Sequence, residues 1–184
     1  MTRGAAKITD LKTIAAGFGG QGILYFGKVM AYAGLIEGKE VSWMPSYGPE
    51  MRGGTANCSV RIADEPIGSP LITNPNALVV MNLLSYDKFI DKVEPGGTVL
   101  IDDSLVSKRT DRTDINCFYL PATVLSDKAG LGYFGNLVML GKLNKELNFC
   151  SFESLAAAIK ESVSASRQSL LASNLKAIEI GANA

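Results

Sequence analysis

The sequence predicts an α/β protein with a single doubly wound, mostly parallel, Rossmann-like sheet and a helical C-terminal tail. Short apolar runs of strand length alternate with segments whose apolar residues recur at helical spacing, which is typical of parallel sheets covered by helices. From Phe134 onward only the helical spacing continues. The chain has 184 residues, the usual length of one domain, so we expect residues 1–184 to form a single unit.

The first half of the chain is expected to contain three strands and one helix. The apolar run at 11–16 predicts a first strand, and the residues after Gly22 have helical spacing. Residues 39–43 predict a second strand, and the prolines and glycines of 44–55 predict a long loop. Residues 56–63 alternate between apolar and polar, so we expect a half-exposed strand that can pair antiparallel.

The second half continues the alternation. Continuous apolar runs at 77–81 and 99–101 predict strands covered on both faces, with a short amphipathic helix at 86–93 between them. Residues 115–120 predict a further strand, and Pro121 can begin the helix that follows it.

The tail is expected to contain three helices. The first begins near Phe134, and Ser151 is the expected N-cap of the second. The third covers about residues 165–180, and Gly181 is expected to end it.

Composition and charge argue against two kinds of partner. The formal net charge is +0 and the isoelectric point is about 6.3, so no overall charge attracts the chain to nucleic acid or to an anionic membrane. No stretch approaches the ~20 apolar residues that span a bilayer, and residues 1–12 lack the pattern of a signal peptide. We therefore expect a cytoplasmic protein.

Residue types that carry chemistry are sparse. The chain has no histidine, which removes the most common general base and zinc ligand. Cys58, Cys117 and Cys150 are widely spaced, so we interpret them as buried, reduced thiols. Asp102 and Asp103 follow a predicted strand and could act as acid and base, but we favour a capping role. We expect no catalytic residue and no metal ligand on this chain.

A GxGxxG motif at 17–22 lies between the first predicted strand and the first predicted helix. There, backbone amides and a helix N-terminus can hold a phosphate; alternatively, the glycines only permit a tight turn and close packing. An NAD site is disfavoured because the second strand does not end in an acidic residue, and Glu37 and Glu40 come too early. Gln21 either donates to a ligand carbonyl, which we favour, or closes the loop on itself.

A second motif at 46–55 reads Ser-Tyr-Gly-Pro-Glu-Met-Arg-Gly-Gly-Thr. Arg52 lies next to two glycines and can make a bidentate contact with a carboxylate or phosphate, or else an ion pair with Glu50 that stiffens the loop. The candidate cofactor-binding residues of both motifs are Gly17, Gly19, Gly20, Gln21, Gly22, Arg52, Gly53, Gly54 and Thr55.

The two motifs together resemble the gamma subunits of the 2-oxoacid:ferredoxin oxidoreductases, most closely the 2-oxoglutarate type. GFGGQGI at 17–23 and SYGPEMRGGTANC at 46–58 carry the resemblance. Further matching segments lie at 68–72, 81–86, 97–104 and 136–141, so the resemblance covers nearly the whole chain.

The resemblance implies an enzyme that converts a 2-oxoacid, CoA and oxidised ferredoxin to acyl-CoA, CO2 and reduced ferredoxin. Thiamine diphosphate, Mg²⁺ and [4Fe–4S] clusters are expected on sister alpha, beta and, where present, delta subunits, because this chain has no GDG segment and no set of four clustered cysteines. The glycine loop would share in CoA recognition. The residues expected to face the catalytic subunits are Tyr47, Gly48, Pro49, Glu50 and Arg52.

Several alternatives stay open. The chain could be the small subunit of an indolepyruvate, pyruvate or branched-chain oxoacid ferredoxin oxidoreductase, a free-standing nucleotide-binding oxidoreductase, or an interaction domain without enzymatic activity. We also allow for a homodimer of the isolated chain.

Overall fold

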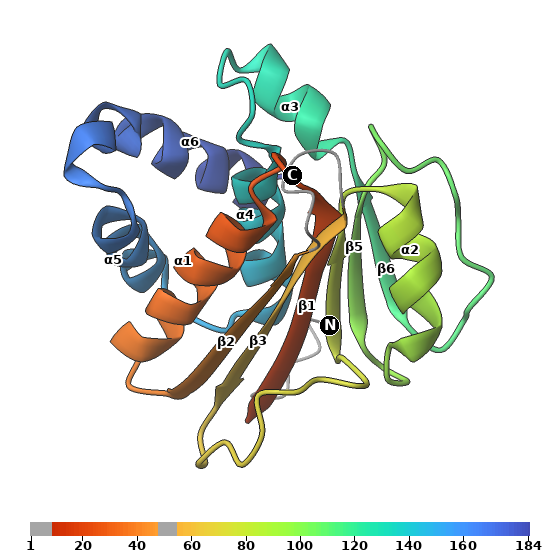
Figure 1. Cartoon of the computed structure of the whole chain (residues 1–184). Helices are drawn as coiled ribbons and strands as arrows, with labels where there is room; N and C mark the ends of the chain where they lie inside the picture. Colours follow the sequence, from red (N-terminus) through yellow and green to blue (C-terminus); the bar gives the residue numbers. More distant parts are fainter. Residues whose placement is uncertain (1–8, 48–54) are drawn as a thin grey trace, which may run out of the picture.

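The computed structural model describes residues 9–47 and 55–184, which fold around one six-stranded sheet in the order β2-β3-β1-β4-β5-β6 (Figure 1). The strands are β1 (Asp10–Phe18), β2 (Glu40–Tyr47), β3 (Thr55–Ala63), β4 (Ala77–Val80), β5 (Thr98–Asp102) and β6 (Asn116–Leu120). β1, β4, β5 and β6 run parallel to one another, whereas β3 pairs antiparallel with both β1 and β2. The expected mostly parallel α/β fold is confirmed, including an antiparallel β3.

Helices cover both faces of the sheet. They are α1 (Ile23–Ile36), α2 (Leu83–Phe89), α3 (Ala122–Lys128), α4 (Gly135–Leu147), α5 (Phe152–Ser162) and α6 (Leu171–Ala182), with short 3₁₀ turns η1 (Ile90–Lys92) and η2 (Ala165–Leu170). Apolar residues of α1, α4, α5 and α6 form one core against the sheet, and α2 packs on the opposite face, as Figure 1 shows. Among the described residues no helix combines the length and the apolar character needed to cross a bilayer.

Side-chain caps fix the start of two helices. Ser151 is the N-cap of α5, as expected, and its hydroxyl oxygen accepts a hydrogen bond from the Ser154 amide at 3.1 Å. α2 begins at Leu83, earlier than expected, because Asn82 caps it: its side-chain oxygen accepts from the Ser85 amide at 2.7 Å. Asparagine is among the best N-cap residues, so the motif was available in the sequence.

The predicted loop at 44–55 is wrong at both ends. β2 continues to Tyr47 and β3 begins at Thr55, and the antiparallel pairing of the two strands extends to Tyr47 opposite Ala56. Pro45, which suggested a loop, lies instead within β2, at the edge of the sheet. An edge strand tolerates proline because one side of its backbone needs no partner.

Gly181 does not end the last helix, which continues to Ala182. The glycine lies instead where α6 crosses α4. A Cβ atom on Gly181 would come within 1.8 Å of the Val138 carbonyl oxygen, and one on Gly141 within 2.0 Å of the Ile178 carbonyl oxygen. Both positions therefore need glycine to allow the close approach of two backbones.

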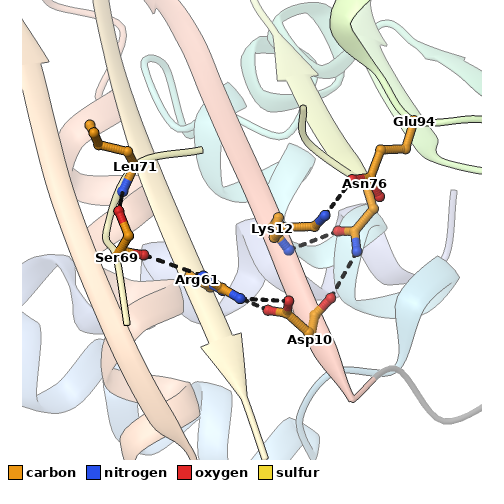
Figure 2. A network of polar contacts seen from close by, with 7 residues as sticks. All are labelled: Asp10, Lys12, Arg61, Ser69, Leu71, Asn76 and Glu94. Atoms are coloured by element: carbon orange, nitrogen blue, oxygen red, sulfur yellow. Dashed lines mark hydrogen bonds and ion pairs between the residues drawn. The ribbon is translucent and has the colours of Figure 1, made fainter. Parts of the chain in front are cut away.

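A polar network joins the amino ends of β1 and β4 to the carboxyl end of β3 (Figure 2). The Arg61 guanidinium on β3 makes a two-point contact with the Asp10 carboxylate on β1, at 2.8 and 2.9 Å. The Asn76 side chain accepts from the Lys12 amide at 2.7 Å and donates to the Asp10 carbonyl at 2.8 Å, and Lys12 also pairs with Glu94. This network links β1, β3 and the residues before β4 and β5 at the end of the sheet that lies opposite the glycine loop.

Candidate functional site

The glycine loop joins β1 to α1 at the carboxyl end of the central strand. Gly20 and Gly22 have φ angles of 102° and 75°, in the left-handed region that side chains rarely adopt. Gly22 is the N-cap of α1, and no side chain caps that helix end. The first amides of α1 are thus available to an anion, and the helix dipole favours negative charge there.

Gln21 closes this loop. Its side-chain oxygen accepts from the Phe18 amide at 2.5 Å, and its side-chain nitrogen donates to the Met81 carbonyl at 2.9 Å. A Cβ atom on Gly17 would come within 2.5 Å of that side-chain oxygen, so Gly17 makes room for it. The side chain therefore shapes the loop and ties it to the end of β4, which is the second of the two uses that we considered for Gln21; a contact between its other N–H and a ligand stays a prediction.

Asn136, at the start of α4, holds the other end of the loop. Its side-chain nitrogen donates to the Gly22 carbonyl at 3.0 Å. A Cβ atom on Gly22 would come within 2.5 Å of the same nitrogen. Asn136 belongs to a segment that supported the family resemblance, but no spacing rule connects it with a loop 114 residues away.

The second motif meets the first at its ends. Thr55 pairs with Phe18 and Ala56 with Gly17, so the start of β3 lies beside the glycine loop, and the Thr55 side chain is exposed. The backbone of Tyr47 pairs with Ala56. The remaining predicted residues of this motif lie outside the described residues: Gly48, Pro49, Glu50, Arg52, Gly53 and Gly54.

Two hollows flank the loop. One, of about 380 Å³, is lined by Phe18, Gly19, Gly20, Gly22, Ile23, Leu24, Tyr25 and Ala56. The other, of about 410 Å³, lies between α1, α4 and the segment that joins α5 to α6. Both volumes fall within the range of small-molecule sites, and Gly22 and Tyr25 contribute to both hollows.

Asp102 has the capping role that we favoured. The carboxylate is fully buried; one oxygen accepts from the Thr123 amide at 3.1 Å and the Thr123 hydroxyl at 2.6 Å, and the other accepts from the Ser104 amide at 3.1 Å. Asp103 pairs with Arg109 at 3.4 Å. These contacts tie the end of β5 to the start of α3 and leave the two carboxylates with structural partners.

The thiols are poorly suited to nucleophilic chemistry. Burial raises the pKa of Cys58 and of Cys150 to about 12, so both are protonated at neutral pH. Cys117 is only half-buried, contrary to expectation, although burial still raises its pKa. In the described ranges no three potential metal ligands of the Cys, Asp or Glu type come together.

Comparisons with known proteins agree with one another. The model of the family "Pyruvate ferredoxin/flavodoxin oxidoreductase" matches residues 12–184. The ketoisovalerate oxidoreductase subunit VorA of Methanothermobacter thermautotrophicus is 38% identical over 96% of this chain, which spans only 36% of that relative's length. The 2-oxoglutarate synthase subunit KorC of Methanocaldococcus jannaschii is 40% identical over 80% of this chain and 81% of its own.

Two solved structures have the same fold. The keto/oxoacid ferredoxin oxidoreductase gamma subunit from Geobacter sulfurreducens matches with a TM-score of 0.81 and 27% identity, covering 94% of each chain. The 2-oxoglutarate:ferredoxin oxidoreductase from Magnetococcus marinus, solved with 2-oxoglutarate, coenzyme A and succinyl-CoA bound, matches with a TM-score of 0.85 and 25% identity. It covers 96% of this chain, which spans 31% of that longer chain.

Proposed function

Because the chain belongs to the pyruvate ferredoxin/flavodoxin oxidoreductase family, we propose that it is the gamma subunit of a multi-subunit 2-oxoacid:ferredoxin oxidoreductase. The observation that carries the proposal is the end-to-end match with a solved gamma subunit, which covers 94% of both chains. The complete enzyme converts a 2-oxoacid, CoA and oxidised ferredoxin to acyl-CoA, CO2 and reduced ferredoxin. We place the complex in the cytoplasm.

The 2-oxoacid is 2-oxoglutarate in this proposal. The KorC relative supports this choice, because the match covers most of this chain and most of the KorC subunit. A branched-chain oxoacid is the second candidate, favoured by the VorA relative, which covers nearly all of this chain. The VorA match includes only about a third of the relative, so it says less about the organisation of the complex.

The chain contributes binding and positioning in this proposal. When bound to sister alpha, beta and, where present, delta subunits, thiamine diphosphate, Mg²⁺ and [4Fe–4S] clusters supply the decarboxylation and electron-transfer chemistry. Burial raises the pKa of Cys58 and of Cys150 to about 12, which keeps both thiols protonated and makes them poor nucleophiles and poor cluster ligands. Hydrogen bonds from Gln21 and Asn136 fix the conformation of the glycine loop, which supports a role for the loop as a preformed binding surface.

CoA is the cofactor that the glycine loop would contact. The uncapped N-terminus of α1 and the hollow of about 380 Å³ beside Gly19 and Gly20 suit a diphosphate group. The Magnetococcus enzyme with bound CoA supports this assignment. Arg52, Gly53, Gly54 and Thr55 would extend the contact, and the segment from Tyr47 to Arg52, with Gly48, Pro49 and Glu50, would face the catalytic subunits.

Affinity purification of the tagged chain from its native host under strict anaerobiosis tests the proposal, followed by CoA-dependent ferredoxin reduction with several 2-oxoacids. We expect sister subunits with thiamine diphosphate and clusters to co-purify, and 2-oxoglutarate to turn over fastest. Preference for a branched-chain oxoacid would select the second candidate. A chain that purifies alone and binds NAD would instead indicate a free-standing oxidoreductase.

A further inference from the structure

The carboxyl edge of the sheet exposes apolar side chains beyond the glycine loop, over β4, β5 and β6. Leucines follow β4 and β5 closely, a valine lies in α3 after β6, and a tyrosine precedes α4. We call these exposed residues the apolar edge: Leu83, Leu84, Leu105, Val124 and Tyr133. Leu84 is 58% exposed and Tyr133 is 97% exposed. Single exposed apolar residues are common on protein surfaces, so these five are informative only if they form one patch.

Strand register and close contacts place the five residues on one surface. β4, β5 and β6 are parallel neighbours, so the segments that follow them leave the sheet side by side, and Figure 1 shows α3 and the start of α2 at this same end. The Ser104 hydroxyl oxygen accepts from the Val124 amide at 3.3 Å, which joins the segment of Leu105 to α3. α3 lies against the start of α4, because a Cβ atom on Gly135 would come within 3.2 Å of the Thr123 Cα. The apolar edge therefore extends from α2 across β5 to α3 and the loop before α4.

The glycine loop lies at the same edge and continues the surface toward β1. The Gln21 side chain donates to the Met81 carbonyl at 2.9 Å, two residues before the first leucine of α2. The Asn136 side chain donates to the Gly22 carbonyl at 3.0 Å, three residues after Tyr133. Side-chain hydrogen bonds thus join the glycine loop to both ends of the apolar edge.

Charged side chains are scarce at this edge. Two charged residues, Asp102 and Asp103, occur in the five segments that form it: 17–24, 81–86, 102–106, 120–125 and 131–136. Asp102 is fully buried and accepts from Thr123, and Asp103 pairs with Arg109. Eleven charged residues occur over a similar total length in the segments at the amino edge: 37–40, 64–76, 90–97 and 111–115. Depletion of charge beside exposed aliphatic and aromatic groups is typical of the core of a protein–protein interface.

Local hydrogen bonds hold the apolar edge in a fixed conformation. The Asn82 side chain caps the start of α2 and so fixes the helical turn that carries the two leucines. The loop that carries Tyr133 is held by the Ser126 hydroxyl, which donates to the Gly132 carbonyl at 2.7 Å, and by the Leu131 amide, which donates to the Ser126 carbonyl at 3.0 Å. A preformed surface loses little conformational entropy when a partner binds, and tyrosine is among the residues that contribute most to interfaces.

We infer that the apolar edge docks on an apolar surface of a catalytic sister subunit and forms the part of that interface from which water is excluded. The inference rests on the proposed function and extends it to residues outside the two glycine-containing motifs. Continuity with the glycine loop favours this partner, because the proposed function places that loop beside the catalytic subunits. The longer relatives also favour it. This chain spans 36% of the VorA subunit and 31% of the Magnetococcus chain, so further protein is covalently joined to the matching part in both.

Affinity purification of tagged variants from the native host tests the inference, with the ratio of catalytic subunits to tagged chain measured by quantitative mass spectrometry. The untagged parent chain in the host competes for the same partner, which keeps this ratio sensitive to affinity. Leu84→Asp and Leu105→Asp should each lower the ratio about tenfold or more, because each removes a buried leucine from the interface and brings a charge into a dry contact. Tyr133→Ala should lower it about three- to tenfold through lost contact alone.

Leu71→Asp is the matched control. Leu71 is 67% exposed, but it lies between β3 and β4 at the opposite end of the sheet, beside Ser69 in Figure 2, so the ratio should not change. The thermal midpoint of each purified variant chain provides the control for folding. Leu84→Asp should leave that midpoint unchanged, because substitutions of exposed side chains usually alter stability little.

The tagged parent chain separates this inference from the proposed function. If the parent co-purifies with catalytic subunits and Leu84→Asp and Leu105→Asp keep the parent's ratio, the proposed function stands and the inference is overturned. An equal loss with Leu71→Asp overturns it as well, because the effect is then not specific to the apolar edge. A dimeric isolated chain that Leu84→Asp makes monomeric, at an unchanged ratio of catalytic subunits, would assign the surface to a second copy instead. A parent chain that purifies without catalytic subunits contradicts the proposed function itself, and with it the partner.

Discussion

The substitution Gly181→Ala tests the packing that positions the helical tail. In an isolated helix this change stabilises, because alanine exceeds glycine in helix propensity by about 1 kcal/mol. Here the new Cβ atom would lie 1.8 Å from the Val138 carbonyl oxygen, where van der Waals contact needs at least 3.4 Å. The neighbour is backbone, so α6 must move away from α4 as a unit. Overpacking typically costs about 1–3 kcal/mol and more when backbone must shift.

The steric cost should therefore exceed the propensity gain and leave a net loss of about 2 kcal/mol. For a domain of this size, that loss lowers the thermal midpoint by roughly 4–8 °C, measured by differential scanning calorimetry. Gly68→Ala is the control, because no heavy atom lies within 4 Å of the position that its new methyl group would take. A Gly181→Ala chain as stable as the parent would refute the steric argument.

The double substitution Gly141→Ala with Gly181→Ala provides a second check. Gly141 makes the reciprocal contact, since its Cβ would come within 2.0 Å of the Ile178 carbonyl oxygen. Once the first methyl group has separated the helices, the second finds part of its space already open. The double variant should therefore lose less stability than the sum of the losses of the two single variants. Full additivity would mean that the two sites relax independently.

Three further predictions concern the loop, the β5 cap and the thiols. Gln21→Leu should lower stability by about 1–3 kcal/mol in denaturant titrations, because it leaves two main-chain groups unpaired. Asp102→Ala should cost about 2–3 kcal/mol, since Thr123 and its amide lose a charged acceptor; unchanged stability would argue against the cap. The folded state raises the pKa of Cys58 and of Cys150 to about 12, so it favours the protonated thiols. Their contribution to the free energy of unfolding is therefore complete below pH ~9, where the unfolded thiols are also protonated, and it is lost as the pH rises toward 12. The thermal midpoint of unfolding should fall as the pH is raised from about 8 to about 11. A thiol reagent added to the folded chain at neutral pH should label neither residue.

The fold was largely predictable because its elements have strong local patterns. The apolar run at 77–81 and the cap at Ser151 depend on a few neighbouring residues, and both were predicted. The Asn82 cap is equally local, although we did not predict it. The errors arose where a distant contact decides. Pro45 is accepted in β2 because that strand lies at the sheet edge, and Gly181 serves the close approach of α6 to α4 instead of ending the helix. The local sequence pattern shows neither the position of β2 at the sheet edge nor the contact between α6 and α4.

The polar network at the amino end of β1 illustrates the same limit (Figure 2). Asn76 follows a stretch without regular structure and has the character of a turn residue in the sequence. In the fold its side chain bonds both the Lys12 amide and the Asp10 carbonyl, as a neighbouring strand would. It thus supplies β1 with partners just before β4 begins at Ala77. Such a role depends on which strands are neighbours, and this follows only from the whole topology.

The glycine motif shows how the structural and ligand-binding interpretations divide among its members. Gly17 and Gly22 are required for packing, because a side chain at either would collide with Gln21 or Asn136. Gly20 has no heavy atom within 4 Å of its Cβ position, and it adopts a φ of 102° while lining the open hollow. Packing therefore explains the first and last glycines, and Gly20 keeps the backbone accessible where a ligand would approach. The two interpretations of the motif are compatible, because the packing at Gly17 and Gly22 fixes the backbone on either side of the exposed Gly20.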